Sequence, residues 1–219
     1  MSVPSAATNS TPAVTVPDDA GRKMWEILCN VGLSLIFLRF AVLQGYSLMA
    51  TWRLSTALIL AKVSTDFVFY LTRSLPKGIS FNLYDWVVGL AGTYAIALFQ
   101  SDATGQDSLL GQAVQVTGLA LQIVAMLSLN RSIGIVPANR GIKTQGLYKF
   151  VRHPLYCSYT IAFLGYVINQ PSTWNIGVYV LALALWVLRL LAEEKFLLQD
   201  QQYQEYASRV QSRMIPGVF

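Results

Sequence analysis

The residues with the clearest chemical potential lie in the stretch 146–156, which contains His153, the only histidine among the 219 residues. Lys149 and Arg152 precede the histidine, and Pro154 follows it at the start of an apolar run. Proline suits the first turn of a helix, because its missing N–H would have no partner there anyway. The N-terminus of a helix carries partial positive charge and free N–H groups, so the sequence predicts an anion-binding position beside Arg152 and His153.

A second polar cluster follows the last long apolar segment and begins with Glu193 and Glu194. Cytoplasmic helix ends usually favour Lys or Arg, so two adjacent glutamates there need either an internal arginine or a cationic ligand. We expect one of them to contact a ligand and the other to pair with Arg189 or Arg213. The tyrosines of this second cluster are Tyr203 and Tyr206.

The elements that must position these clusters are transmembrane helices. The chain is 54% hydrophobic and 12% charged, with a mean hydropathy of +0.46, whereas soluble domains carry about 25% charged residues. Six apolar segments each approach the ~20 residues needed to cross a bilayer core. They are Met24–Gln44, Trp52–Leu71, Tyr84–Gln100, Leu109–Leu129, Leu155–Gln170 and Trp174–Ala192.

The predicted fold is therefore an all-α, polytopic transmembrane bundle of about six helices that ends in a helical hairpin. Only residues 171–173 separate the last two segments. Because a tight hairpin brings the far ends of its helices together, Arg152 and His153 should face Glu193 and Glu194 across a short gap.

The distribution of cations predicts the orientation in the membrane. Most of the 16 Lys and Arg residues lie in the N-terminal flank, in residues 72–83 and 130–154, and after residue 188. By the positive-inside rule, both termini and the His153 segment are cytoplasmic. We expect a multi-pass protein of a prokaryotic plasma membrane, surrounded by membrane lipids. The net charge of +5 then reflects topology and predicts no nucleic-acid partner, and the sequence leaves the oligomeric state open.

Several polar residues interrupt the apolar segments. Lys62 and Asp66 are four residues apart and can neutralise each other on one helical face. Arg39 has no predicted partner. Three glutamines of the fourth segment share a face that should turn inward and form hydrogen bonds between helices. They are Gln112, Gln115 and Gln122.

The sequence divides into three predicted regions. Residues 1–21 are rich in Ser, Thr, Ala and Pro and are predicted to be a disordered tail. Residues 22–129 form transmembrane scaffold helices, and residues 130–219 form a catalytic region. The two cysteines, Cys29 and Cys157, lie far apart in apolar runs, so neither a metal site nor a disulfide framework is expected.

The ordered polar motifs resemble those of the isoprenylcysteine carboxyl methyltransferase family, whose relatives are the phospholipid N-methyltransferases. The resemblance covers roughly residues 130–219 and is closest to the bacterial branch. The residues that carry it are Gly146-x-Tyr148, Val151-Arg-His-Pro154-x-Tyr156, Glu193-Glu194, Tyr203-x-x-Tyr206 and Ile215-Pro216-Gly217.

This resemblance implies a cytoplasm-facing site for S-adenosylmethionine. Glutamates can accept hydrogen bonds from the ammonium or ribose hydroxyls, Arg152 or helix N–H groups can bind the carboxylate, and tyrosines can stack on adenine or line the sulfonium. The cofactor-binding residues that it implies are Tyr148, His153, Pro154, Tyr156, Glu193, Glu194, Tyr203 and Tyr206.

We therefore expect a methyltransferase that uses S-adenosylmethionine and acts on an amphiphilic or isoprenoid acceptor reached from the bilayer. A carboxylate acceptor is already ionised and needs no general base, so positioning and shelter from water are the main requirements. The residues expected to act in catalysis are Arg152, which would orient the carboxylate, together with His153 and Glu194.

Three alternatives stay open at this point. A lipid amine acceptor would have to lose a proton, for which His153 is the available base. An NADPH-dependent membrane reductase of the sterol type also resembles the Arg-His-Pro-x-Tyr segment, although a pyrophosphate cofactor would favour cations where Glu193 and Glu194 stand. A transporter or scaffold would carry its polar groups at mid-membrane, whereas the two clusters map to one face.

Overall fold

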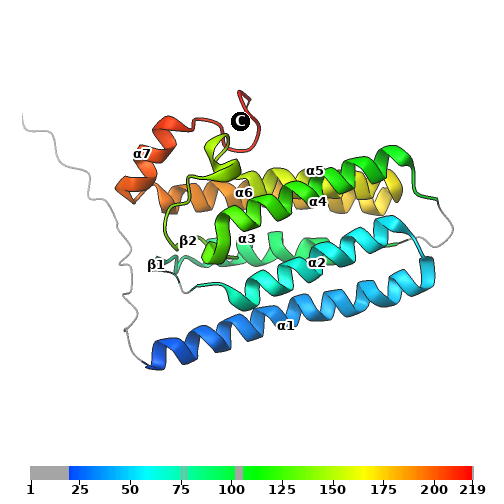
Figure 1. Ribbon diagram of the computed structural model, residues 1–219, viewed down its shortest axis with the longest axis horizontal. Coiled ribbons are helices and arrows are strands. Elements are labelled where there is room, and N and C mark those ends of the chain that lie inside the picture. The colour runs from blue at the N-terminus through cyan, green and yellow to red at the C-terminus, as the bar shows by residue number, and fades with distance from the viewer. Residues whose placement is uncertain (1–19, 75, 77, 102–105, 219) are drawn as a thin grey trace, which may run out of the picture.

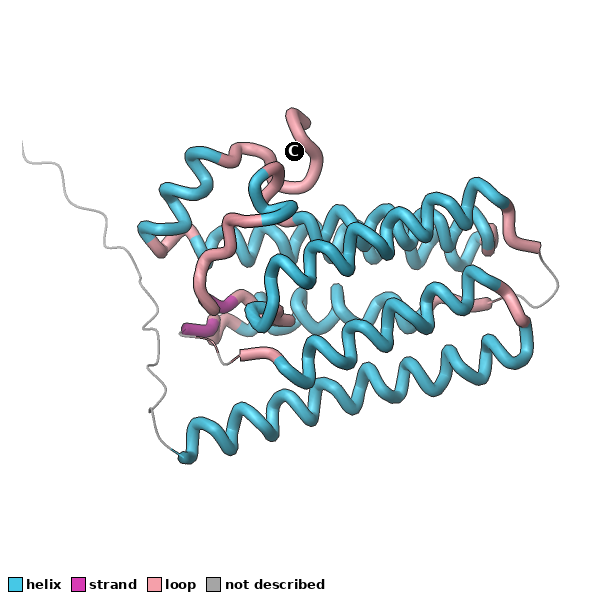
Figure 2. The backbone as a smooth tube through the Cα atoms, viewed as in Figure 1, coloured by secondary structure: helices cyan, strands magenta, loops and turns pink. Residues whose placement is uncertain are grey.

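The computed structural model describes residues 20–74, 76, 78–101 and 106–218, so most of the predicted disordered tail, residues 1–19, lies outside the described residues. The fold is all-α, as predicted, and its helices form an elongated bundle (Figure 1). In the described ranges, the β-structure is limited to one antiparallel pair of two-residue strands, β1 (Gly78–Ile79) and β2 (Ala138–Asn139), at one end of the bundle (Figure 2).

Each predicted apolar segment corresponds to a helix or a pair of helical pieces. The α-helices are α1 (Ala20–Thr51), α2 (Leu54–Thr72), α3 (Leu83–Tyr94), α4 (Leu109–Leu129), α5 (Pro154–Asn169), α6 (Thr173–Leu197) and the short α7 (Gln201–Arg209). The 3-10 turns are η1 (Ala95–Leu98), η2 (Asn130–Ser132) and η3 (Gly146–Lys149). Four helical spans are long and apolar enough to cross a membrane, namely Asn30–Thr51, Leu54–Thr72, Leu109–Ser132 and Thr173–Leu197, whereas Leu83–Leu98 and α5 are shorter.

Local capping explains where several helices begin. The side chains of Asn82, Ser108, Ser172 and Asp200 accept hydrogen bonds from the first-turn N–H groups of α3, α4, α6 and α7, which satisfies donors that have no partner inside the helix. Helix α5 begins with Pro154 in its first turn, as predicted. The observed bounds of α4 coincide with the predicted segment because Ser108 fixes its start.

The third apolar segment, predicted as Tyr84–Gln100, is one short helical stretch, Leu83–Leu98, in which α3 ends at Tyr94 and a 3-10 turn continues to Leu98. Helix α6 supplies hydrogen-bond partners where the 3-10 turn ends. The indole of Trp174 donates to the carbonyl of Leu98 at 2.7 Å, and the amide of Asn175 donates to the carbonyl of Gln100 at 2.9 Å. Side chains from a neighbouring helix thus replace the intrahelical hydrogen bonds.

Helices α4 and α5 pack closely through small residues. A side chain at Gly118 would collide with the backbone of Ala162, and one at Gly165 would collide with the backbone of Gln115. Such close approach of backbones is typical of small-residue interfaces between membrane helices. The predicted inward face of α4 is confirmed for Gln115 and Gln122, which are buried, whereas Gln112 is half-buried. Gln115 donates to the carbonyl of Ser55 at 2.9 Å.

The predicted Lys62–Asp66 pair is also confirmed. The Lys62 ammonium lies 2.6 Å from a carboxylate oxygen of Asp66, and Gln122 of α4 donates to the other oxygen at 3.0 Å. Both charged side chains are buried, with 5% and 3% of their surface exposed. Arg39, by contrast, lies exposed on α1.

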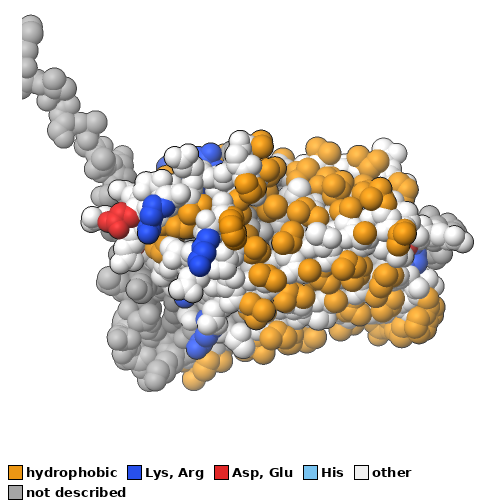
Figure 3. All heavy atoms as spheres, turned by 45° about the horizontal axis from the view of Figure 1, so that its top comes forward, with side chains coloured by type: hydrophobic (Ala, Val, Ile, Leu, Met, Phe, Trp, Pro, Cys, Tyr) orange, Lys and Arg blue, Asp and Glu red, His pale blue; other side chains and the backbone are white. Residues whose placement is uncertain are grey.

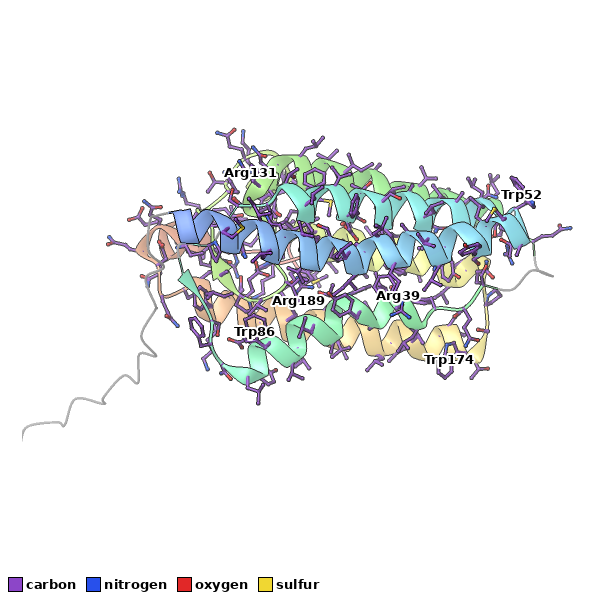
Figure 4. All side chains as sticks on the ribbon, turned by 90° about the horizontal axis from the view of Figure 1, so that it is seen from below. Arg39, Trp52, Trp86, Arg131, Trp174 and Arg189 are labelled. Carbon is purple, nitrogen blue, oxygen red and sulfur yellow. The ribbon has the colours of Figure 1, made fainter. Side chains whose placement is uncertain are left out.

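The surface has the pattern of a membrane protein. In Figure 3, hydrophobic side chains cover most of the visible length, and charged side chains gather toward the end that carries α7. Exposed tryptophans mark both ends: Trp52 and Trp174 lie at one end, and Trp86 lies toward the other (Figure 4). Such aromatic side chains favour the interfaces of a bilayer. The start of α1 and the C-terminal residues lie at the same end (Figure 1).

A buried ion pair closes the opposite end of the bundle. The Arg53 guanidinium lies 2.7 Å from the Asp107 carboxylate, which also accepts hydrogen bonds from the backbone and hydroxyl of Ser55. Burial alone would raise the pKa of Asp107, but the hydrogen bonds from Ser55 and the charge of Arg53 outweigh it and lower that pKa. Arg53 also donates to Gln170 after α5, so this cluster ties three loops together.

Candidate active site

A cavity opens at the end of the bundle that carries α7. The space that water can occupy inside it is about 90 Å³, and the space including its open mouth is about 780 Å³. Its walls come from α2, α5, α6, α7 and the loop that follows α4. The ionisable Arg, Lys, His and Glu side chains that line it are Arg140, Lys143, Arg152, His153, Arg189 and Glu193.

The Glu194 carboxylate is the centre of an ion cluster beside this cavity. Arg152 approaches it with two nitrogens, at 2.6 and 3.1 Å, and Arg213 donates to it at 2.5 Å. The Tyr203 hydroxyl and the Nε2 atom of His153 each lie 3.2 Å away. Glu194 is only 3% exposed, so a buried carboxylate is satisfied here by four protein groups.

Arg152 links this cluster to α7. Besides its two contacts with Glu194, its third nitrogen donates to the carbonyls of Ala207 and Val210 at 3.3 and 3.0 Å. An arginine at these positions satisfies the free carbonyls at the C-terminus of α7 and complements the helix dipole. Arg152 therefore holds α7 against the start of α5.

The C-terminal segment completes this wall. The backbone N–H groups of Arg152 and His153 donate to the carbonyls of Ser212 and Arg213 at 3.0 and 2.7 Å. The Tyr206 hydroxyl donates to the carbonyl of Tyr148 at 2.7 Å. Residues 212–213 thus fix the backbone of the Arg-His segment directly.

Glu193 has a different environment from its neighbour. It lines the cavity, and the hydroxyl of Tyr156 donates to it at 2.9 Å. The predicted division between the two glutamates is therefore seen in their geometry: Glu194 forms the ion pair with Arg213, and Glu193 faces the cavity. Arg189 does not form the predicted pair with either glutamate; it donates to Thr93 and Gly134 instead.

The tyrosines around the cavity are neutral hydrogen-bonding groups. Burial, helped by the nearby Glu193 charge, holds the pKa of Tyr148 well above its usual range. Burial and the charge of Glu194 raise the pKa of Tyr203, and burial raises the pKa of Tyr206 to about 12. All three phenols therefore keep their protons near neutral pH and present both a donor and an aromatic face.

The structure brings most of the sequence-predicted site residues to this one cavity. Pro154 and Glu194 stand behind its wall, at the start of α5 and in the ion cluster. The lining residues among the predicted set are Tyr148, Arg152, His153, Tyr156, Glu193, Tyr203 and Tyr206.

Sequence reasoning missed other lining residues. Tyr159 lies three residues after Tyr156 on α5, so helical spacing was an available signal for it. Tyr70 comes from α2, far away in the sequence, and no pattern connects it with the cavity. Arg140 and Lys143 come from a loop without periodicity. Burial, with the Arg73 charge, lowers the pKa of Arg140 to about 10, which leaves it charged near neutral pH.

Comparison with known proteins gives a match that includes part of this site. Residues 107–205 match the family model described as phospholipid methyltransferase. This range includes Arg152, His153, Glu193 and Glu194 and ends before Tyr206. A comparison with curated proteins gives no match.

Proposed function

We propose that this membrane protein, whose residues 107–205 belong to the phospholipid methyltransferase family, uses S-adenosylmethionine to methylate a lipophilic acceptor. We further propose that the accepting group is a carboxylate. The observation that carries the proposal is the cavity at the α7 end, in which a carboxylate, several cations and neutral phenols line one space.

The lining residues fit the cofactor. Glu193 faces the cavity and can accept from the cofactor's ammonium or ribose hydroxyls, because among the described side chains only Tyr156 is seen donating to it. Arg140 and Lys143 can bind the cofactor's carboxylate. Tyr148 and Tyr206 present aromatic surface for adenine or for the sulfonium. We assign Glu194 to holding the site together, since its oxygens are already shared among protein donors.

When bound, S-adenosylmethionine supplies a methyl group on a positively charged sulfur, and transfer to a carboxylate oxygen breaks the S–C bond, forms an O–C bond and leaves a neutral thioether and a neutral ester. No proton has to leave, so the protein needs no general base. Its residues must align the two partners and keep out water, which would stabilise the separated charges.

A carboxylate acceptor is supported by the charges around the cavity. Glu194 balances the charge of Arg152. Three further cationic side chains line the cavity, Arg140, Lys143 and Arg189, against the single carboxylate of Glu193. A lipid amine is the second candidate, since the family description names phospholipids. That reaction needs a base, and His153 would have to take the proton although Glu194 holds its Nε2 atom at 3.2 Å.

Calorimetric titration of the detergent-purified protein with S-adenosylhomocysteine, beside NADPH, tests the cofactor. We expect saturable binding of S-adenosylhomocysteine and none of NADPH. Glu193→Gln should weaken the binding by about tenfold, the loss of one charge-assisted hydrogen bond. Glu205→Gln, on the exposed face of α7, is the matched control and should bind normally. Binding of NADPH alone would favour the reductase instead.

A further inference from the structure

Helix α1 is the least enclosed of the long helices. Only 11% of the residues in the most apolar window of its span, Asn30–Thr51, are buried, against 33% to 39% in the other three spans. The helix packs against α2 (Figure 1), and none of the described residues that line the cavity at the α7 end comes from it. One side of α1 is therefore open to the bilayer.

Arg39 lies on this open side, deep in the span. A contact with α2 marks the start of the span, because the side chain of Asn30 donates to the carbonyl of Arg73, directly after the end of α2, at 2.8 Å. The nine residues from Asn30 to Arg39 correspond to about 14 Å of helix rise, close to the middle of a hydrocarbon core of ~30 Å. Figure 4 shows Arg39 between the ends marked by Trp52 and Arg131.

The charge of Arg39 is not neutralised within the part of the chain that the structure describes. The side chain is exposed, and no hydrogen bond or ion pair joins it to another described residue. The neighbouring carboxylate on α2, Asp66, is buried and is already engaged by Lys62 and Gln122. A charged side chain at such a depth is costly when it faces lipid, and membrane proteins usually pair it. Arg39 therefore calls for an anionic partner from outside the chain.

The residues around Arg39 form a continuous stripe suited to packing against another helix. They recur at alternating intervals of four and three residues, the spacing at which one side of a helix faces a neighbouring helix. A side chain at Gly32 would meet open space, so the backbone of a partner can approach closely there. We call this surface the α1 stripe; its residues, all exposed, are Leu28, Gly32, Leu35, Arg39, Val42, Tyr46 and Met49.

A second copy of the chain and the lipid headgroups are both poorly placed to supply the missing charge. Copies share one orientation in the membrane, so two α1 stripes would meet in parallel and bring Arg39 against its own counterpart, which repels it. The carboxylates of the other three described spans are Asp66, which is buried, and Glu193 and Glu194, which lie at the end that carries the cavity. Headgroups lie at the surface of the hydrocarbon core, so the side chain would have to cover most of its half-thickness to reach them.

We propose that the α1 stripe is the docking surface for a transmembrane helix of another membrane protein, one that presents a carboxylate at the depth of Arg39. The apolar residues of the stripe supply contact along its length, and Gly32 admits the backbone of the partner. Arg39 selects the partner by charge, because a helix without an acidic residue would leave the guanidinium unpaired. This inference is independent of the proposed function, since the stripe lies outside the cavity.

The first test measures association with synthetic helices in phosphatidylcholine vesicles. Each probe is an oligoleucine peptide of about 20 residues that carries either glutamate or glutamine at its centre. Resonance energy transfer is recorded from a dye on the peptide to a dye on Thr144→Cys in a cysteine-free background. We expect the glutamate peptide to associate about tenfold more tightly than the glutamine peptide, the contribution of a charge-assisted hydrogen bond. Equal association of the two peptides would overturn the inference.

Variants of the α1 stripe test its two features separately. In Arg39→Leu the preference for glutamate should disappear, whereas Arg39→Lys should keep part of it, because the charge is kept and the fork of donors is lost. Gly32→Leu should weaken association of both peptides by filling the place where their backbones approach. Gly177→Leu is the matched control, since a side chain on this exposed part of α6 also meets open space, and it should behave as wild type. A preference for glutamate that survives in Arg39→Leu would contradict the proposal.

Two further measurements identify other occupants of the α1 stripe. Energy transfer between differently labelled copies of the chain that disappears in Arg39→Leu would assign the stripe to a contact between copies. Enrichment of phosphatidylglycerol around the wild-type protein that disappears in Arg39→Leu, without any preference between the peptides, would assign Arg39 to a lipid headgroup. Either result would overturn the inference.

Discussion

Two adjacent carboxylates in this protein have separate tasks because they lie on different faces of α6. Glu194 points into a cluster of donors from α5, α7 and the C-terminal segment, whereas Glu193 faces open space. A buried carboxylate surrounded by cations is costly to neutralise, since each cation then loses its counter-charge.

We therefore expect Glu194→Gln to destabilise the fold. The substitution leaves Arg152 and Arg213 without their shared carboxylate and should cost about 3 kcal/mol, or about 6 to 12 °C in the unfolding midpoint of a chain of this size. Thermal unfolding in detergent measures the change. Glu193→Gln should unfold close to the wild-type midpoint, and equal losses in the two variants would contradict the assignment of separate tasks.

Asp107 gives a second prediction at the scale of a residue. Because its pKa is lowered in the folded protein, its contribution to stability is present above the unfolded value near 3.9 and is lost as the pH falls through the lower folded pKa. Asp107→Asn should therefore lower the unfolding midpoint at pH 7, and its difference from wild type should shrink below about pH 4. A difference that stays constant from pH 7 to pH 3 would show that the charge of Asp107 is not responsible.

At the scale of elements, the α4–α5 contact depends on glycines that admit no side chain. Gly118→Ala would push a methyl group into the backbone of Ala162, and we expect a cost of about 1–3 kcal/mol from overpacking. Gly177→Ala is the control, because a side chain there meets open space and alanine favours a helix. Unfolding of both variants in detergent is the measurement, and an unchanged midpoint in Gly118→Ala would contradict the tight contact.

An element could be predicted from the sequence where neighbouring residues define it, and could not where its partners lie far along the chain. Hydrophobic length was sufficient to bound α4, and the short connection 171–173 was sufficient to place Arg152 beside Glu194. The end of the third helical stretch at Leu98 was not predictable, since the hydrogen-bond partners of Leu98 and Gln100 are Trp174 and Asn175, about 75 residues further along the chain.

The residues of the candidate site also differ in how well the sequence predicts them. Residues within the recognised motifs were found from the sequence, as Tyr156 was in Arg-His-Pro-x-Tyr. Arg189 was recognised as a cation, but its partners Thr93 and Gly134 are set by packing between α6 and distant parts of the chain. A sequence pattern contains no information about which of several nearby arginines is left facing a cavity.

At the scale of the whole molecule, the start of α1 and the C-terminal residues lie toward the same end of the bundle, the end that carries α7 (Figure 1). We expect this end to face the cytoplasm, since cations gather there. In a cysteine-free background, Thr144→Cys at the cavity end should react with an impermeant maleimide only after cells are permeabilised. Thr173→Cys, which is exposed at the first residue of α6, should react in intact cells. The reverse pattern would invert the topology.

The pairing of Ser212 and Arg213 with the Arg-His segment has a consequence for biosynthesis. All six apolar segments precede these two residues, so a ribosome delivers every helix to the membrane before the residues that secure α7 have emerged. A chain ending before Ser212 would keep all six apolar segments and would lack the two carbonyls that fix the backbone of the Arg-His segment. Synthesis of the last residues therefore comes before the cavity wall can be completed.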